Sequence, residues 1–340
     1  MSRRTTVLVT GTVLLLLFGV LGALLPVPYI AEVPGPTYNT LGDIDGTPII
    51  EVTGREPNET SGNLNLTTVG IPQRPLTLVG AVKGWLDREV TVVPREQVYP
   101  SGQSREETRQ QGREQFLTSE QAARGAALAD LGYPEAVVVQ DLAANSPSEG
   151  QLSAGDAIDA VNGVPTPDQA ALTAALAAIP PGTTVPVAYT RLGAPGVGTV
   201  TTTAAAKGGG SALGVVVLQT PHAPFDVDVQ VEDVIGPSAG LMLSLGIIDM
   251  VGDTDLTEGA VVAGTGTIGV DGAVGPIGGI PLKMVAARDI DAELFLVPAD
   301  NCAEARQNAQ PGLPLAKVAT LDDALAALAD LRAGKVPPSC

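Results

Sequence analysis

Hydrophobic positions divide the chain into parts of different kinds, and the first part is a long apolar run. Val7 to Leu25 is almost entirely apolar, and no residue between Arg4 and Glu32 is charged. At 1.5 Å per residue, a helix over this run reaches across the hydrocarbon core of a bilayer. Arg3 and Arg4 precede the run and acidic residues follow it. The positive-inside rule therefore predicts a single-pass anchor over residues 1–28, with a cytoplasmic N-terminus and the bulk of the chain outside the cytoplasm.

A cleaved signal peptide is the alternative interpretation of this run. Its apolar region would be shorter, and a small-x-small cleavage site would follow it. Leu24-Leu25-Pro26-Val27-Pro28-Tyr29 follows instead. The pattern favours an uncleaved anchor in the cell membrane, and the sequence alone does not settle whether it is cleaved.

Residues 29–117 alternate short apolar runs with Pro, Gly and Asn, which is typical of strands and turns. Strands are predicted at 48–52, 63–67 and 89–93. Residues 101–112 are polar enough to form a linker or an exposed helix. We expect a β-rich extracytoplasmic region with a polar linker, and no motif in it carries chemistry.

Residues 118–206 are predicted to form a second unit. A helix runs from Ser119 to Leu131, with Ser119 or Thr118 as its cap. The remaining pattern predicts two strands and an Ala/Leu helix, at 137–139, 184–189 and 167–179.

Within this unit, Ser146 to Gly163 carries a serine-proline turn, a G-L-x-x-G-D-x-I-like element and a V-N-G turn. These residues resemble a bacterial PDZ domain, although Gln151 lengthens the usual G-L step by one residue. The resemblance implies a unit that binds an extended peptide or a peptide terminus as an added strand. The alternative is a small α/β domain that only holds other parts together.

The third unit, residues 207–340, contains a serine on a tight glycine turn. Val227 to Val234 alternates like a strand and leads into Gly236-Pro237-Ser238-Ala239-Gly240. The apolar run after it predicts a buried helix that starts at Pro237. Ser238 is then expected in the first helical turn. There, the unpaired backbone N–H groups of Ser238 and Ala239 are candidate donors for an oxyanion.

A lysine follows the serine by 45 positions, at Lys283. Asp271-Gly272 predicts a hairpin turn, and Gly278-Gly279 then leads into a helix whose first turn holds Lys283. The positive end of the helix dipole and the apolar neighbours Ile280, Leu282 and Met284 both lower the pKa of an amine. Lys283 is therefore a candidate general base for a Ser238 nucleophile. The hydroxyl of Thr265 is a candidate support for the pair.

The chain's single histidine, His222, does not fit the usual serine-hydrolase plans. The G-x-S-x-G pattern also occurs in α/β-hydrolases, where an acid and then a histidine follow the serine. His222 precedes Ser238 and lies between Pro221 and Pro224, so we interpret it as a loop residue.

At these residues the resemblance becomes specific. G-P-S-A-G, then T-G-x-I and D-G-x-V-x-P-I-G-G-I-x-x-K-x-x-A-A, resemble the proteolytic domain of the Lon family over about 120 residues. The resemblance implies Ser238 as nucleophile, Lys283 as general base and Thr265 near the lysine amine. It also implies a homo-oligomer, a hexameric ring. Two positions depart from the family pattern: Ile235 stands where many Lon domains have aspartate, and Thr267 replaces the glutamate of T-G-E-I.

Composition limits the kinds of partner that we expect this chain to bind. A formal net charge of −18 argues against nucleic acid as a binding partner. Cys302 and Cys340 lack metal-ligand spacing, so no metal or other cofactor is predicted, and whether the two cysteines pair is left open. No G-x-x-x-x-G-K-[ST] motif occurs, which favours a protease that works without ATP.

Together these features predict a multi-domain α+β and α/β chain with a transmembrane helix, a β-rich region, a PDZ-like domain and a Lon-type proteolytic domain. The whole chain resembles bacterial membrane-anchored, PDZ-containing Lon-like proteases. The expected activity is ATP-independent serine endopeptidase action on extracytoplasmic proteins or peptides. The alternative is a catalytically inactive scaffold or binding protein.

Overall fold

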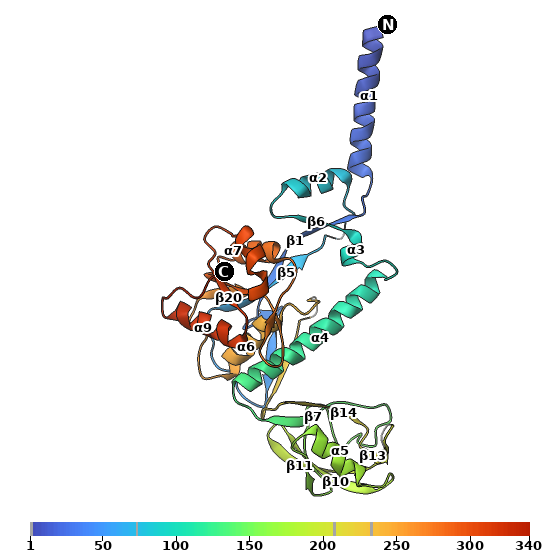
Figure 1. Cartoon of the computed structure of the whole chain (residues 1–340), viewed down its shortest axis with the longest axis vertical. Helices are drawn as coiled ribbons and strands as arrows, with labels where there is room; N and C mark the ends of the chain where they lie inside the picture. Colours follow the sequence, from blue (N-terminus) through green and yellow to red (C-terminus); the bar gives the residue numbers. More distant parts are fainter. Residues whose placement is uncertain (1–2, 73, 207–208, 232–233) are drawn as a thin grey trace.

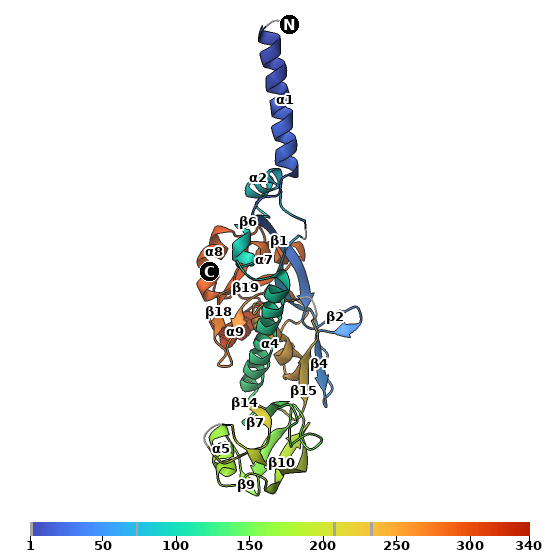
Figure 2. The same cartoon turned by 90° about the vertical axis from the view of Figure 1, so that its right-hand side faces the viewer.

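The chain forms an elongated molecule with a free helix at one end and a small β-rich unit at the other (Figures 1 and 2). The computed structural model describes residues 3–72, 74–206, 209–231 and 234–340. Residues 1–2 of the predicted anchor and residues 232–233 of the predicted strand lie outside the described residues, as do 73 and 207–208.

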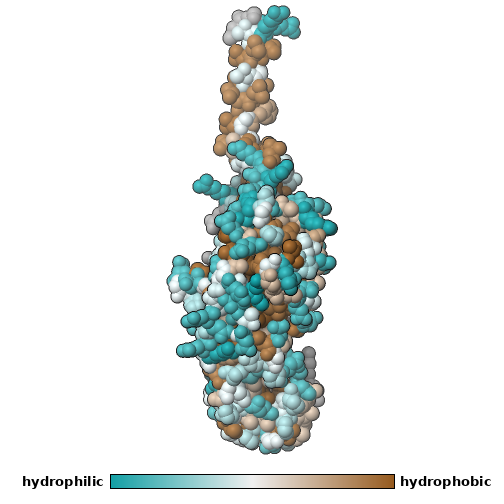
Figure 3. Space-filling model, turned by 90° about the vertical axis from the view of Figure 1, so that its left-hand side faces the viewer, coloured by the Kyte–Doolittle hydropathy of each residue, from teal (hydrophilic) through white to brown (hydrophobic). Residues whose placement is uncertain are grey.

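Helix α1 (Arg3–Leu24) confirms the predicted apolar helix. None of its residues is buried against the rest of the chain, and its side chains form a hydrophobic rod that projects from the body (Figure 3). By length and composition, it is able to cross a membrane.

A mixed six-stranded sheet forms the centre of the molecule, in the order β20-β19-β16-β5-β1-β6. The four strands β20, β19, β16 and β5 are parallel, whereas β1 is antiparallel to both of its neighbours. In chain order the strands are β1 (Tyr29–Asn39), β5 (Asn63–Gly70), β6 (Thr91–Pro94), β16 (Val261–Gly264), β19 (Leu294–Pro298) and β20 (Leu315–Val318).

Alternating residues of the inner strands build a core on each face of this sheet. Leu294 and Leu296 of β19 join the core formed with α4, α6 and α9, whereas Phe295 and Val297 join the core formed with α7 and α8. These helices are α4 (Arg105–Asp130), α6 (Gly240–Val251), α7 (Ile280–Asp289), α8 (Cys302–Gln307) and α9 (Leu321–Arg332). The result is a layered α/β body.

A disulfide joins Cys302, at the start of α8, to Cys340. The sequence left this pairing open. Cys302 is buried and Cys340 packs against the same core as α7. The bond therefore ties the C-terminal segment to the layered body.

Helix α4 is longer than the predicted helix and starts earlier. Ser104, not Ser119 or Thr118, caps it: the Ser104 hydroxyl accepts from the Glu107 N–H and the Glu107 carboxylate accepts from the Ser104 N–H. This capping box explains the early start. The polar stretch 101–112 is thus largely the first turns of α4.

The small unit at the far end is an antiparallel sheet in the order β11-β10-β8-β7-β14, covered by one helix. Asn162 and Gly163 both have positive φ, as the predicted β-turn requires. Its elements are β7 (Glu135–Leu142), β8 (Ala157–Val161), β9 (Val164–Pro165), α5 (Gln169–Ala177), β10 (Thr184–Arg191), β11 (Ala194–Thr201) and β14 (Val215–Pro221). We refer to residues 135–221 as the PDZ-like unit.

Gln151, the extra residue of the PDZ-like motif, lies in a turn of this unit. Its N–H and that of Leu152 both donate to the Ser148 carbonyl, and its side-chain oxygen accepts from the Thr199 N–H. The added residue therefore binds the neighbouring strand instead of disturbing the sheet.

The division of the chain differs from the predicted one at two boundaries. Residues 29–117 do not form a region of their own, because β1, β5 and β6 lie in the same sheet as β16 and β19. Residues 118–130 belong to α4, which packs along α6 of the layered body, and the PDZ-like unit extends to β14. The PDZ-like unit is therefore inserted between two halves of one body.

Short elements complete the chain. They are β2 (Asp43–Ile44), β3 (Thr47–Pro48), β4 (Ile50–Thr53), α2 (Leu78–Leu86), α3 (Arg95–Val98), β12 (Thr203–Ala204), β13 (Ser211–Ala212), β15 (Asp226–Val229), β17 (Thr267–Ile268), β18 (Val274–Gly275) and η1 (Ala299–Asn301). β17 and β18 form the predicted hairpin around Asp271-Gly272.

Candidate active site

The glycine turn that carries Ser238 lies immediately before α6. Gly236 has a φ of +86°, which glycine adopts without strain. The predicted position of Ser238 inside the first helical turn is wrong, since α6 begins at Gly240. The physical reason lies in the Ser238 carbonyl, which accepts from the Gly266 N–H at 3.0 Å and is thereby tied to a neighbouring loop. Ser238 is partly exposed, so its hydroxyl is accessible.

Lys283 lies in a different helix from the one that follows Ser238, and its side chain extends to the Ser238 hydroxyl. Its helix, α7, starts after Gly279, whose φ is +76°, and Pro281 lies in the first turn as predicted. The Lys283 side chain is buried, with Nζ at 2.8 Å from the Ser238 Oγ. Burial lowers the pKa of the Lys283 amine from 10.5 to about 7. Near neutral pH, a large share of the amine is therefore unprotonated and able to accept a proton.

Thr265 connects the serine and the lysine. Its Oγ1 lies 2.9 Å from the Lys283 Nζ, and its hydroxyl donates to the Ser238 carbonyl at 3.0 Å. Thr265 is 1% exposed. The structure thus brings together the three side chains that the sequence singled out.

Helix α4 holds the glycine turn from outside, a contact that the sequence analysis does not predict. The Gly236 N–H donates to the Gly112 carbonyl at 2.8 Å, and the Ser119 hydroxyl donates to the Pro237 carbonyl at 2.9 Å. A Cβ on Gly240 would lie 2.7 Å from the Ser119 Oγ, so glycine there permits the close approach. The serine turn is fixed by α4 on one side and by the Thr265 loop on the other.

Ser119 and Gly112 lie more than a hundred positions before the serine turn, which explains why sequence reasoning missed them. Ser119 is a buried serine in a long helix, and it was interpreted only as a helix cap. A polar residue on the apolar face of α4 was the one available signal.

A cavity of about 400 Å³ opens beside the serine turn, between α4 and β17. Pro237, Thr267 and Ile268 line one wall. The α4 wall is mostly polar and consists of Gln111, Glu114, Gln115, Thr118, Ser119 and Ala122. Thr267, one of the departures from the Lon pattern, therefore lines the same cavity as Pro237, the residue before Ser238.

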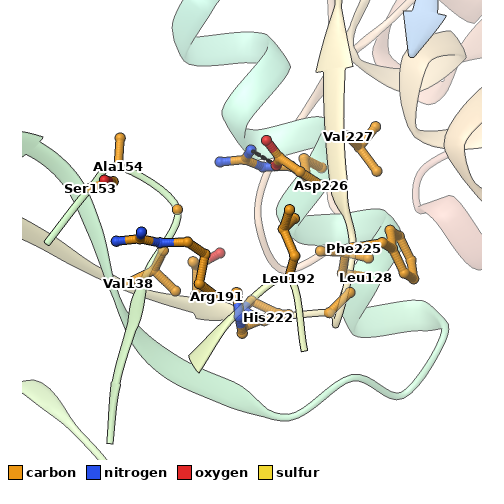
Figure 4. Close-up of a pocket in the computed structure, with 15 residues that line it drawn as sticks. Leu128, Val138, Ser153, Ala154, Arg191, Leu192, His222, Phe225, Asp226 and Val227 are labelled. Atoms are coloured by element: carbon orange, nitrogen blue, oxygen red, sulfur yellow. Dashed lines mark hydrogen bonds and ion pairs between the residues drawn. The ribbon is translucent and has the colours of Figure 1, made fainter. Parts of the chain in front are cut away.

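His222 lies away from this site, in agreement with its interpretation as a loop residue. It follows β14 and lines a separate cavity of about 230 Å³ between α4 and the PDZ-like unit, together with Arg191 and Leu192 (Figure 4). Burial lowers the pKa of the His222 imidazole. In the part of the chain that the structure describes, no group of three or more His, Cys, Asp or Glu side chains is arranged to hold a metal ion.

In the comparison with known proteins, residues 225–329 match the family model of the Lon protease (S16) C-terminal proteolytic domain. A Lon protease of Phenylobacterium zucineum (strain HLK1) is 36% identical over 104 residues, which is 30% of this chain and 13% of that protein. A Lon protease of Azospirillum brasilense is 38% identical over 93 residues, which is 26% of this chain and 11% of that protein. The chain thus spans only a small part of the curated relatives that it matches.

Among solved structures, PDZ domains are neighbours. That of an SdrC-like protein from Listeria monocytogenes has 22% identity and a TM-score of 0.23, and covers 24% of this chain and 87% of that domain chain. Its counterpart from Listeria innocua has 23% identity and a TM-score of 0.24, and covers 26% and 99%. At these scores the likeness carries no functional conclusion. The family match is the stronger finding: this mixed α/β chain contains a Lon-type proteolytic domain.

Proposed function

We propose that this protein is a membrane-anchored serine endopeptidase that hydrolyses peptide bonds by a Ser238–Lys283 dyad. The observation that carries the proposal is the 2.8 Å contact between an accessible serine hydroxyl and a buried amine whose pKa is about 7. Such a pair matches a nucleophile with an adjacent general base. The Lon-type match over residues 225–329 supports the same class of reaction.

The reaction follows from these atoms. Ser238 Oγ attacks the carbonyl carbon of the scissile peptide bond, and its proton passes to Lys283 Nζ. The C–N bond then breaks as Nζ returns that proton to the leaving amine. Water attacks the resulting ester, again with Nζ taking a proton, and Ser238 Oγ leaves with it. Thr265 orients the amine throughout, through its Oγ1.

The negative oxygen of each tetrahedral intermediate needs donors, and the N–H groups of Ser238 and Ala239 are the proposed ones. Both precede the first turn of α6. Within the described part of the chain, neither donates a hydrogen bond to another group. A preorganised donor of this kind contributes roughly 3 kcal/mol to lowering the barrier.

The groove beside the serine turn is proposed to bind the substrate chain. Its 400 Å³ volume and polar α4 wall suit an extended, unfolded segment. Because no phosphate-binding motif occurs in the sequence, hydrolysis is proposed to need no ATP.

The PDZ-like unit is proposed to bind a peptide terminus and α1 to anchor the chain, with the catalytic domain outside the cytoplasm. The apolar length of α1 and the arginines before it support this arrangement. The hexameric ring remains a proposal that rests on the resemblance to Lon-type domains.

The test is hydrolysis of casein by the full chain, compared with Ser238→Ala. We expect activity in the wild type, none in Ser238→Ala, and no dependence on ATP. Ser244→Ala is the matched control, because Ser244 lies in the helix that follows Ser238 and bonds only to backbone carbonyls. Equal activity in Ser238→Ala would refute the dyad, and inactivity of every form would favour the scaffold.

A further inference from the structure

Helix α2 has an apolar face that the described part of the chain leaves largely exposed. Its five large apolar side chains are between 42% and 82% exposed, and they recur at helical spacing on one side. They are Leu78, Val79, Val82, Trp85 and Leu86. On the opposite side, Ala81 and Gly84 are buried, and a Cβ on Gly84 would lie 2.6 Å from a Val92 methyl of β6. The helix is thus pressed onto the body by its small residues and turns its large ones outward.

Helix α2 lies directly at the C-terminal end of α1, across its direction (Figure 1). A Cβ on Gly22 of α1 would be in van der Waals contact with Leu78 and Val79, at 3.7 and 3.8 Å. The Val27 N–H donates to the Leu76 carbonyl at 2.8 Å, and this bond fixes the start of α2 next to the C-terminal end of α1. The uncovered face is therefore held where the apolar rod of α1 ends.

Two aromatic rings lie near the C-terminal end of α1. Trp85 and Tyr29 meet edge to face, with their ring centroids 5.8 Å apart. Trp and Tyr are enriched where the hydrocarbon of a bilayer gives way to the headgroups. A short helix with an apolar face and an exposed Trp at this level is suited to lie in the membrane interface.

A cationic cavity of about 570 Å³ adjoins the start of α2. Arg74, Arg95 and Arg105 line it, and both Arg95 and Arg105 lie over the ring of Tyr99, at 5.3 and 5.4 Å from its centroid. In the described ranges, none of the three forms an ion pair with a carboxylate. In a chain with a net charge of −18, three unpaired arginines around one cavity are a local exception that fits an anionic group.

We propose that α2 lies in the leaflet at the C-terminal end of α1, and that the arginine cavity beside it binds the phosphate of an anionic phospholipid. The inference rests on the membrane anchorage of the proposed function but not on its dyad. Continuity with α1 selects the membrane as the occupant, and charge complementarity selects an anionic headgroup. The contact would hold the layered body against the membrane surface, so that α1 would not be its only attachment to the bilayer.

Trp85 is the only tryptophan of the chain, so its fluorescence reports on α2 alone. The full chain with Ser238→Ala, which prevents self-digestion, is reconstituted in phosphatidylcholine–phosphatidylglycerol vesicles. We expect emission shifted to shorter wavelength, strong quenching by brominated lipid tails and weak quenching by aqueous acrylamide. Val82→Glu with Leu86→Glu should reverse all three, whereas Val336→Glu, at a residue that is 89% exposed, should change none.

Two results would overturn the membrane contact. Quenching of Trp85 fluorescence by acrylamide but not by brominated lipid would mean that α2 is exposed to water. Quenching by neither would mean that a second protein copy covers Trp85. Flotation with the vesicles tests anchorage by α1 separately. A chain that floats with an acrylamide-accessible Trp85 refutes this inference and leaves the proposed function standing.

The lipid preference is measured by energy transfer from Trp85 to dansyl-labelled lipid. Transfer to labelled phosphatidylglycerol should exceed that to labelled phosphatidylcholine, and the excess should vanish in Arg74→Gln/Arg95→Gln/Arg105→Gln. The control Arg306→Gln/Lys317→Gln/Lys335→Gln removes the same charge from exposed positions and should keep the excess. Equal transfer in the wild type would overturn the headgroup site, and loss of the excess on adding inorganic phosphate would assign the cavity to free phosphate.

Discussion

The layered body and the PDZ-like unit accommodate buried ionisable side chains in opposite ways, as a comparison of Lys283 with Asp156 shows. Lys283 in the layered body is 3% exposed and meets two hydroxyl groups. Asp156 in the PDZ-like unit is fully buried and meets both Arg191 Nε and Arg191 Nη2, at 2.6 and 2.8 Å. The Ser153 N–H also donates to Asp156 at 2.8 Å. Among the described residues, Lys283 has no carboxylate partner.

The difference fits the role that we propose for each site. An unpaired buried charge is costly, and this cost lowers the pKa of the Lys283 amine to about 7. Asp156 is instead matched by a bidentate arginine, and its hydrogen bonds raise the pKa of Arg191. An uncompensated lysine suits proton transfer, whereas a compensated aspartate suits a fixed fold.

Lys283→Met should give the largest effect and should act in two directions. Activity should fall by about 10⁴-fold or more, because no general base remains. Stability should rise, because the pKa of Lys283 falls on folding from 10.5 to about 7. The unfolded chain binds the extra proton, so burial of the lysine destabilises the fold by up to about 5 kcal/mol. This cost is complete below pH 7 and fades as the pH rises toward 10.5.

Urea unfolding at pH 7 and at pH 10 measures this effect. The gain in Lys283→Met should be several kcal/mol at pH 7 and small at pH 10. Lys317→Met, at an exposed position, is the control and should change neither activity nor stability. A loss of stability at pH 7 would mean that Lys283 is buried without a cost and would remove the contrast with Asp156.

The pH dependence of peptide hydrolysis should give the next largest effect. The neutral amine of Lys283 is the active form, and its pKa is about 7. Activity should fall tenfold per pH unit below 7, about 100-fold at pH 5, and should level off above 7. Glu120 also has a pKa raised to about 7, mainly by burial. The rate profile of Glu120→Gln must therefore keep its midpoint, and a profile that moves with Glu120 would contradict the assignment to Lys283.

Asp156→Asn tests the other half of the comparison. Loss of the carboxylate charge leaves the Arg191 fork partly unmatched, and we expect the PDZ-like unit to lose about 2–3 kcal/mol. Arg191 is 43% exposed, so solvent screening keeps the loss below that of a fully buried pair. Hydrogen exchange of β8 and β10 measures it. Asp159→Asn, at an exposed position of the strand that follows Asp156, is the control, and equal protection in the two variants would show the Arg191 pair to be unimportant.

Thr265→Val sharpens the description of the lysine site, because it removes the second hydroxyl around Nζ. We expect the rate constant to fall roughly tenfold with little change in KM, since the amine loses a partner that orients it. Thr265→Ser retains the hydroxyl and should restore most of the rate. If Val and Ser reduced the rate equally, the role of Thr265 would be packing and not orientation.

Local patterns predicted the residues of this site but not the body that carries it. Pro237, Gly279 and the Asp271-Gly272 turn are short-range signals of backbone geometry, and they bring Ser238 and Lys283 to the ends of predicted elements. The pairing of β5 with β16 joins residues almost 200 positions apart, from Asn63↔Val261 to Leu66↔Gly264. No periodicity encodes that register, so the sequence pattern predicts a separate region over residues 29–117. The inserted PDZ-like unit separates the two halves and conceals their common sheet.

Ser119→Ala tests whether this distant half contributes to catalysis, and its effect should be the smallest. The Ser119 hydroxyl donates to the Pro237 carbonyl, so its loss loosens the serine turn but removes no reacting group. We expect kcat to fall about fivefold, which corresponds to one hydrogen bond of about 1 kcal/mol, while the acid limb of the pH profile stays at Lys283's pKa of about 7. Thr108→Ala is the matched control, because Thr108 lies in the same helix but outside the groove, and its hydroxyl bonds only to the Ser104 carbonyl. A shifted pH profile would mean that Ser119 acts on the lysine, and an unchanged kcat would mean that the Gly236 N–H bond to Gly112 alone holds the turn. A reduced kcat with an unmoved profile would identify α4, which lies outside the Lon-type match, as a positioning element of the active site.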